Sequence, residues 1–190
     1  MLTNVISSFA QTNCDHPDYA PLVALYQATN GENWTTSWDL SDCDVCSYSG
    51  ITCDENGRVA GIDLDENNLI GFIPSEIGEF SNLTSLNLAR NTLSRSIPSS
   101  VGNLTALTGL TLSANQFSGS IPSEIGNLTA LASLSLDFNS LSGEIPSSLG
   151  NLIKIILLTL RGNDLTGNIP GSLGNLNIGE FLILDDNNLS

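Results

Sequence analysis

The sequence predicts an α/β solenoid, a fold in which short units stack and each unit contacts only its neighbours. Two repeating features predict it. The dipeptide Ile-Pro recurs every 24 residues, with its prolines at Pro74, Pro98, Pro122, Pro146 and Pro170. An asparagine recurs at the same interval, at Asn67, Asn91, Asn115, Asn139, Asn163 and Asn187. Because a fixed period in the twenties is typical of stacked repeats, we expect residues 59–190 to form one stack whose last unit is incomplete.

Each unit begins with a predicted strand, as residues 107–128 illustrate. Leu110 and Leu112 alternate with polar residues, which predicts a strand that buries one face and exposes the other. Asn115 follows where the chain must turn. A buried amide has two donors and an acceptor that can satisfy the backbone groups of turns, so we expect the recurring asparagines to form a ladder along the stack.

The second half of the unit predicts a turn and a short return. Gly119 suits a positive φ or a close approach of neighbouring coils, because glycine has no Cβ. Pro122 cannot donate to a sheet and is expected at its edge or end. Residues 126–128 then predict a short helical or 3₁₀ segment.

The whole unit, LxxLxLxxNxLSGxIPxxIGNL, resembles the plant-type leucine-rich repeat over residues 59–190. The resemblance implies a right-handed superhelix with a parallel concave β-sheet of about six strands and short 3₁₀ or helical returns on the convex side. The strands are expected near Ile62, Leu86, Leu110, Leu134, Leu158 and Leu182.

Residues 14–58 are expected to form an amino-terminal cap that seals the first coil. The apolar spacing of residues 19–29 predicts a helix, and Asn30-Gly31 is a typical stop signal. Trp34 and Trp38 follow and are expected to cover the first coil. We expect residues 1–13 to be a leader remnant or disordered, since they lack the basic start and apolar core of a complete signal peptide.

All four cysteines lie in this cap segment, and an even set of this kind is typical of a small disulfide-bonded subdomain. The sequence alone permits three pairings. A zinc site made by Cys43, Cys46, Cys53 and His16 is an alternative, but it lacks a second closely spaced cysteine pair. Disulfides would place the protein in an oxidising compartment, outside the cell or on its surface.

The segment from Cys46 to Cys53 resembles the CxWxGVxC signature of plant-type caps, with Tyr48 where the family usually has tryptophan. Resemblance to the caps of polygalacturonase inhibitors implies the pairs Cys14–Cys43 and Cys46–Cys53. Asn56-Gly57 predicts a hairpin turn that leads into the first strand of the repeats.

The charge of the chain restricts its partners. Its formal net charge is −15, with only five Lys and Arg residues, and 13 of its 20 acids precede residue 80. Nucleic acids and anionic membranes gain nothing from such a surface, so the partners are expected to be neutral or basic, although acidity can also serve solubility. The sequence contains no run near the roughly 20 apolar residues of a membrane helix.

Sequons for N-glycosylation precede or lie within the repeats at Asn33, Asn82, Asn103 and Asn127, and a weaker one starts at Asn188. The sequence Gly-Asn-Leu-Thr can also recur for a structural reason, because it forms the return turn of each repeat. The chain stops at Ser190 inside a repeat, and we expect it to be part of a longer protein with further repeats or a membrane anchor.

Catalytic and metal-binding motifs are not evident in the sequence. His16 is the only histidine, and a solvated or capping role is expected for it. Residues 63–67 resemble part of a calcium loop, but Leu64 and Asn67 are needed for the core and the ladder. We therefore expect no metal, no cofactor and no enzymatic activity.

Binding is the expected function, and the strand alternation predicts the surface that performs it. The ligand-binding residues expected on the concave face are Asp63, Asp65, Asn87, Arg90, Thr111, Ser113, Ser135, Asp137, Phe138, Thr159, Arg161, Ile183 and Asp185. Phe138 and Arg161 differ from the small and acidic residues around them, and aromatic and arginine residues often anchor interfaces. A second, apolar patch is expected from Ile156, Leu157, Phe181 and Ile183, unless later repeats cover it.

Three function classes follow from these patterns. The first is an extracellular recognition module that binds a protein, peptide or glycan, as part of a receptor-like or adhesion protein. The second is a secreted inhibitor of a cell-wall-degrading enzyme. The third is an ice-binding or surface-structural protein, which the mixed concave column Asp63, Asn87, Thr111, Ser135, Thr159 and Ile183 does not favour. The first is preferred.

Overall fold

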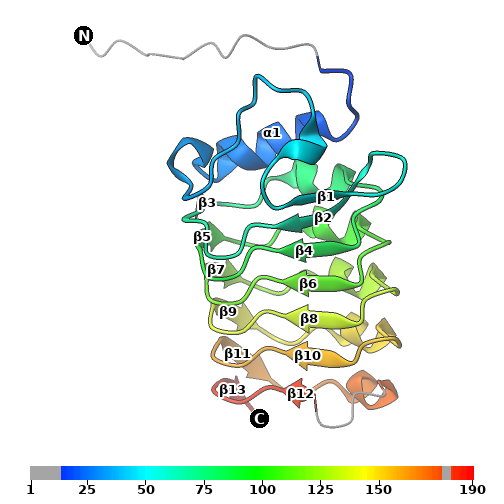
Figure 1. Ribbon diagram of the computed structural model, residues 1–190. Helices are drawn as coiled ribbons and strands as arrows, with labels where there is room; N and C mark the ends of the chain where they lie inside the picture. The colour runs from blue at the N-terminus through cyan, green and yellow to red at the C-terminus, as the bar shows by residue number, and fades with distance from the viewer. Residues whose placement is uncertain (1–13, 177–180) are drawn as a thin grey trace, which may run out of the picture.

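The computed structural model describes residues 14–176 and 181–190 of the chain (Figure 1). It confirms the predicted solenoid, with a cap at the amino-terminal end and successive coils below it. The predicted leader, residues 1–13, lies outside the described residues.

The concave sheet contains one strand from each coil. Its strands are β2 (Val59–Asp63), β4 (Ser85–Asn87), β6 (Gly109–Thr111), β8 (Ser133–Ser135), β10 (Leu157–Thr159) and β12 (Leu182–Ile183). They are parallel and in register, so that Leu86 pairs with Ile62 on one side and with Leu110 on the other. The cap adds β1 (Ile51–Cys53), which is antiparallel to β2 through the predicted hairpin. Over residues 14–176 and 181–190 the sheet therefore has seven strands, one more than the repeats supply.

A second sheet, which the sequence analysis did not predict, runs along the other edge of the coils (Figure 1). Its strands are β3 (Ile70–Gly71), β5 (Thr92–Arg95), β7 (Gln116–Gly119), β9 (Ser140–Gly143), β11 (Asp164–Gly167) and β13 (Asn188–Leu189). These segments are short and rich in serine and glycine, so their pattern indicates a turn. Pairing with neighbouring coils gives them their extended form.

Short 3₁₀ helices form the convex side, as predicted for the returns. They span Ser75–Glu79, Ser99–Asn103, Ser123–Asn127, Ser147–Asn151 and Gly171–Asn175, and each follows an extended proline. Glycine within these helices permits close stacking, because a Cβ on Gly126 would lie 2.5 Å from the Ser148 carbonyl oxygen. The spacing of the coils on this side therefore depends on glycine.

The asparagine ladder holds the turns of successive coils together. Asn91 is buried, and its Nδ2 donates to the carbonyl oxygens of Leu64, Leu88 and Ala89 at 2.9, 3.1 and 2.8 Å. Its Oδ1 accepts hydrogen bonds from the backbone N–H groups of Asn67 and Leu69. The asparagines of the following coils repeat this pattern with the coil on their amino-terminal side. One side chain per coil thus satisfies backbone groups that the turn would otherwise bury unpaired.

The cap helix α1 (Tyr19–Ala28) ends within one residue of its predicted end, and Asn30 adopts the left-handed conformation beyond it. Trp34 and Trp38 are buried as expected, and Trp38 stacks on Tyr48 with ring centroids 5.3 Å apart. The aromatic ring of Tyr48 therefore occupies the core in place of the tryptophan that is usual at its position.

Two disulfides close the cap, Cys14–Cys43 and Cys46–Cys53, which is the pairing that the resemblance implies. No cysteine of the described residues is free, so thiolates for the alternative zinc site are lacking. His16 has a structural role, since its Nε2 lies 2.9 Å from the Gly57 carbonyl oxygen and its Nδ1 accepts from the Asp18 N–H.

A buried ion pair attaches the cap to the first coil. Asp18 is only 1% exposed, and its carboxylate accepts hydrogen bonds from Arg58 at 2.7 and 2.9 Å and from the Val59 N–H at 2.8 Å. Burial alone would raise the pKa of Asp18, but the hydrogen bonds from Arg58 and Val59 outweigh it and the pKa lies below its ordinary value. Asp18 is therefore charged at physiological pH.

Candidate functional site

The concave sheet presents the predicted outward residues in two columns that flank the buried leucines. Most of them are exposed or half-buried, including Asp63, Thr111 and Ser135. Thr159 is the exception, because it is only 6% exposed and its hydroxyl donates to the carboxylate of Asp137. Thr159 is therefore too buried to contact a partner.

Asp137 is the centre of a hydrogen-bond network in the middle of this face. Its carboxylate accepts from the Thr159 hydroxyl, from the Arg161 backbone N–H at 2.8 Å and from the Ser135 hydroxyl at 3.2 Å. These bonds satisfy the carboxylate within the protein. Asp137 consequently fixes the local geometry and has little capacity left for a partner.

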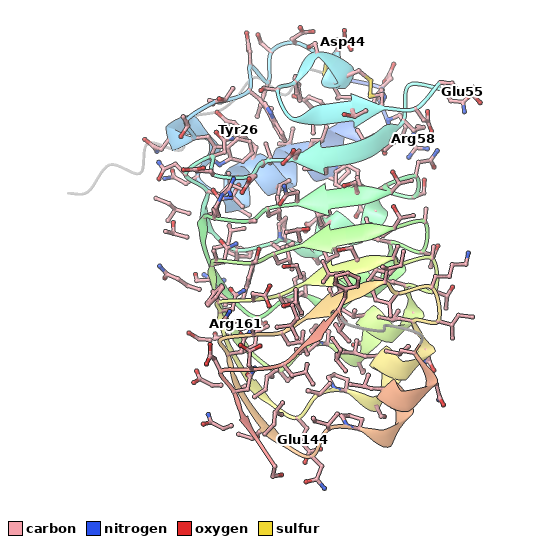
Figure 2. All side chains as sticks on the ribbon, turned by 60° about the horizontal axis from the view of Figure 1, so that its bottom comes forward. Tyr26, Asp44, Glu55, Arg58, Glu144 and Arg161 are labelled. Carbon is pink, nitrogen blue, oxygen red and sulfur yellow. A yellow bond between two sulfur atoms is a disulfide. The ribbon has the colours of Figure 1, made fainter. Side chains whose placement is uncertain are left out.

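Both arginines of the concave side are held by acids, which the sequence analysis did not foresee. Arg161 lies in the carboxy-terminal half of the stack (Figure 2), and its Nε is 3.0 Å from carboxylate oxygens of both Asp185 and Asp186. The hydrogen bond to Asp186 and the charges of both aspartates raise the pKa of the Arg161 guanidinium above its ordinary value. At the other end, Arg90 pairs with Asp65 and, at 3.6 Å, with Glu66.

The residue before each ladder asparagine has a left-handed backbone in every coil. Its φ values lie between 51° and 64° for Glu66, Arg90, Ala114, Phe138, Gly162 and Asp186. Only Gly162 adopts this conformation without a steric penalty, which is roughly 1–2 kcal/mol for other residues. A bulky residue such as phenylalanine is uncommon there. Sequence alone did not predict this column, because glycine occurs in it only once.

Phe138 combines this backbone conformation with an exposed ring. The side chain is 56% exposed, and the Arg161 guanidinium lies 5.7 Å from the ring centroid. Gly162 makes room for the ring, since a Cβ at Gly162 would lie 2.8 Å from Phe138 Cδ1. We call Phe138, Arg161 and Gly162 the aromatic anchor. Since the left-handed backbone is shared by all six coils, the exposed aromatic ring is what distinguishes this position from the others.

Small residues form a low path across the concave sheet. Gly61, Ser85, Gly109 and Ser133 pair in register across four strands, and Leu157 is the next residue in this row. At the amino-terminal end of the row the face has a shallow depression of about 310 Å³, lined by Gly61, Ser85 and Thr84 among others. A second depression, of about 260 Å³, lies in the cap beside Trp38 and Tyr48.

Burial and the neighbouring negative charges raise the pKa of Tyr48 to about 12. Its hydroxyl donates to the Asp42 carbonyl oxygen, and the Trp38 indole N–H donates to the Ser49 carbonyl oxygen at 2.9 Å. The polar ends of both rings are thus used within the cap. The depression beside them is explained by the structure of the cap itself.

The apolar patch predicted toward the carboxy-terminal end is partly exposed. Ile156 and Phe181 are 62% and 52% exposed, whereas Leu157 and Ile183 are half-buried. Ile153, three residues before Ile156 in the sequence, is also exposed, at 68%. It stands at the position that Thr129 occupies one coil earlier.

The described residues, 14–176 and 181–190, contain no cluster of three or more potential metal ligands. At the calcium-like segment, Asp63 accepts a hydrogen bond from Asn87 and Asp65 pairs with Arg90, so both carboxylates have partners in the protein. Within the same residues no helix is long and apolar enough to cross a membrane.

Comparison with known proteins gives matches along most of the stack. Two models described as leucine-rich repeat match residues 58–117 and residues 130–152 and 154–176. Polygalacturonase inhibitor 1 from Oryza sativa subsp. japonica is 36% identical over 74 residues, which are 38% of this chain and 22% of the relative. The chain thus spans less than a quarter of that relative's length.

Solved structures match over nearly the whole chain. The ectodomain of the receptor kinase GASSHO1/SCHENGEN3 from Arabidopsis thaliana, in complex with CASPARIAN STRIP INTEGRITY FACTOR 2, has a TM-score of 0.86 and 38% identity, covering 90% of this chain and 21% of its own. A plant ice-binding protein has a TM-score of 0.84 and 33% identity, covering 93% of this chain and 57% of its own.

Proposed function

Because this chain belongs to the plant-type leucine-rich repeat family with a disulfide-bonded cap, we propose that it is an extracellular recognition module that binds a protein or peptide on its concave face. The proposed role is binding and not catalysis. The observation that carries the proposal is the exposed Phe138 ring, which is held in a left-handed backbone among small residues at the centre of the concave side.

The Arabidopsis receptor kinase HAESA, which is 34% identical and covers 91% of this chain, has been solved in complex with the peptide hormone IDA, and this supports a polypeptide partner here. The surface charge restricts that partner further. Asp63, Asp65 and Glu66 at one end of the concave side and Asp185 and Asp186 at the other outnumber Arg90 and Arg161. Excess negative charge attracts basic partners and increases their association rate at low salt, so we propose a neutral or basic partner.

The experiment that tests this function is selection of random peptides on the immobilised, folded protein, followed by amide hydrogen exchange with the tightest binder. We expect protection in β6, β8 and β10 and in residues 135–139. The Phe138→Ala/Arg161→Ala variant should bind at least tenfold more weakly while it remains folded, since both residues are exposed. Protection confined to the second sheet, or no change in the double variant, would contradict the concave site.

Inhibition of a wall-degrading enzyme is one form that such recognition can take. The similarity to polygalacturonase inhibitor 1 supports it, although that match covers only 38% of this chain. Measurement of polygalacturonase activity in the presence of the purified protein tests it. A reduced rate that the concave double variant restores would assign the inhibitor role.

A second candidate function is ice binding, for which the second sheet offers a specific feature. The same position of successive coils carries a hydroxyl residue in this sheet, at Ser94, Ser118, Ser142, Thr166 and Ser190, of which Ser94 and Ser142 are half-buried. The plant ice-binding protein of similar fold supports this candidate. Inhibition of ice recrystallisation tests it, and loss of that effect in a Ser118→Tyr/Thr166→Tyr variant would place ice on this sheet and not on the concave one.

We also propose N-glycans at sequons along the return edge. Asn103 and Asn127 are exposed at the ends of their 3₁₀ helices, as is Asn33 in the cap. Asn82 differs, since its Nδ2 donates to Asp54 at 2.8 Å and it is half-buried.

A further inference from the structure

The aromatic anchor on the concave side has an occupied side and an open side. On the side of the following coil, the Phe138 ring lies against Gly162, and the Arg161 guanidinium lies 5.7 Å from the ring centroid. Arg161 is itself fixed there by Asp185 and Asp186. The protein therefore supports the ring from one direction only.

On the side of the preceding coil, the equivalent position is Ala114, whose side chain is a single methyl group. One coil further, Arg90 turns away from Ala114, because its guanidinium pairs with Asp65 and Glu66 of the coil before it. Neighbouring strands lie about 4.8 Å apart, so about 10 Å separate the backbones that carry the two large side chains. Only the Ala114 methyl group stands between them.

The chemistry around this position favours an aromatic group over a charged one. The Asp137 carboxylate is bonded to Ser135, Thr159 and the Arg161 N–H, and the acids beside Arg90 are paired with it. A cationic ligand group would therefore have to compete with existing partners. An aromatic ring can pack against the exposed part of Phe138 without displacing any of these ion pairs.

A sugar is also less suited to this position, because the polar groups around it already have hydrogen-bond partners within the protein. Binding of a sugar depends on free hydrogen-bonding groups, but the Asn115 amide is bonded to three carbonyl oxygens and to the Leu93 N–H. The Ala114 N–H donates to the Asp137 carbonyl oxygen, and the Phe138 N–H donates to that of Arg161. What remains exposed beside Ala114 is the Phe138 ring, while the Arg161 guanidinium on the other side of the ring is paired with Asp185 and Asp186.

We propose that the partner inserts one aromatic side chain above Ala114, where it packs on the open side of Phe138. This inference rests on the concave-face function proposed above and adds the chemical class of its central contact. The left-handed column explains how the specificity arises, because the same backbone position carries a different side chain in each coil. Ala114 followed by Phe138 and Gly162 is the combination that leaves an aromatic surface uncovered.

The test uses peptides selected on the folded wild-type protein and three variants of it. Phe138→Ala removes the ring, and Ala114→Arg fills the space beside it with a residue that Arg90 shows to be tolerated in this backbone conformation. Asp164→Ala, on the exposed side of the second sheet, is the control. Circular dichroism confirms that each variant is folded before its dissociation constant is measured.

We expect the selected peptides to share an aromatic residue. Phe138→Ala and Ala114→Arg should each weaken binding at least tenfold, whereas Asp164→Ala should change it less than twofold. In a double-mutant cycle, the aromatic residue of the peptide is replaced by alanine. In the Phe138→Ala variant this replacement should raise the dissociation constant less than twofold, because the ring that it contacts is already absent.

Two kinds of failure are distinguishable. If peptides protect the concave strands but need no aromatic residue, or if the cycle is additive, the proposed insertion of an aromatic side chain is refuted. Binding on the concave face is then still supported. If the peptides protect another face, the proposed function fails together with the anchor. Binding of a glycan that Phe138→Ala abolishes, without peptide binding, would also overturn the inference.

Discussion

Replacement of Asn91 by alanine tests the role of the asparagine ladder. The side chain is 8% exposed, and its Oδ1 accepts from the N–H groups of Asn67 and Leu69. Alanine leaves both N–H groups buried without that acceptor, at about 1–3 kcal/mol each, and it also removes the donor to three carbonyl oxygens. Water that enters the small space left by the side chain can satisfy some of these groups, which lowers the loss of stability. We expect the free energy of unfolding to fall by about 3–4 kcal/mol.

Urea unfolding of the non-reduced protein measures this loss, with circular dichroism for the stack and tryptophan fluorescence for the cap. With a slope of about 2–3 kcal/mol/M, the transition midpoint should fall by about 1 M or more. Asn151→Ala is the matched control, since Asn151 is exposed at the end of a 3₁₀ helix and its loss should cost less than about 0.5 kcal/mol. A midpoint of Asn91→Ala that equals the control would refute the ladder argument.

The other predictions concern the cap, the coil spacing and the turns. Asp18→Asn should cost about 2 kcal/mol at pH 7, because the bonds to Arg58 lose their charge assistance. The pKa of Asp18 in the folded protein lies below its ordinary value of 3.8. The contribution of Asp18 to stability is therefore present above pH 3.8 and is lost as the pH falls through the folded-state pKa. A free energy of unfolding that stays constant between pH 5 and pH 2 would contradict this contribution. Gly126→Ala should destabilise by about 2 kcal/mol or more through its contact with the next coil, whereas Gly109→Ala, whose Cβ would come no closer than 4.0 Å to a neighbouring atom, should be nearly neutral in the same urea titration. Arg95 has a φ of 66° where later coils have glycine. The free energy of unfolding of Arg95→Gly should therefore exceed that of Arg95→Ala by about 1 kcal/mol in the urea titration. Titration of the native protein with a thiol reagent should find no reactive thiol, and four reactive thiols would contradict the disulfide-bonded cap.

Much of the fold follows from the sequence because the repeat determines it. The spacing of Leu110, Leu112 and Asn115 predicts a strand and a turn, and both occur in every coil. The cap helix and the hairpin at Asn56-Gly57 also follow from local signals. These elements are predictable since the local pattern and the stacking of neighbours favour the same structure.

The second sheet could not be predicted from local signals. A segment such as Ser140–Gly143 has little preference for a strand, and it becomes extended only because equivalent segments lie above and below it. Tertiary context determines strand formation in such cases.

The sequence identified side chains that the structure places on the concave face, but not the contacts that they make there. Phe138 and Arg161 were identified because they differ from their neighbours in the repeat. Contacts between coils cannot be predicted from the periodicity. They include the ion pairs of Arg161 with Asp185 and Asp186, and the hydrogen bond from the buried Thr159 to Asp137. The left-handed column was missed since five of its six residues are not glycine.

We propose above all that this chain recognises its partner with the concave face. The most direct measurement compares dissociation constants of one partner for two double variants of similar size. Phe138→Ala/Arg161→Ala changes the concave side, and Gln116→Ala/Asp164→Ala changes exposed residues of the second sheet. We predict at least a tenfold weaker complex for the first variant and less than a twofold change for the second. The reverse order would contradict the claim.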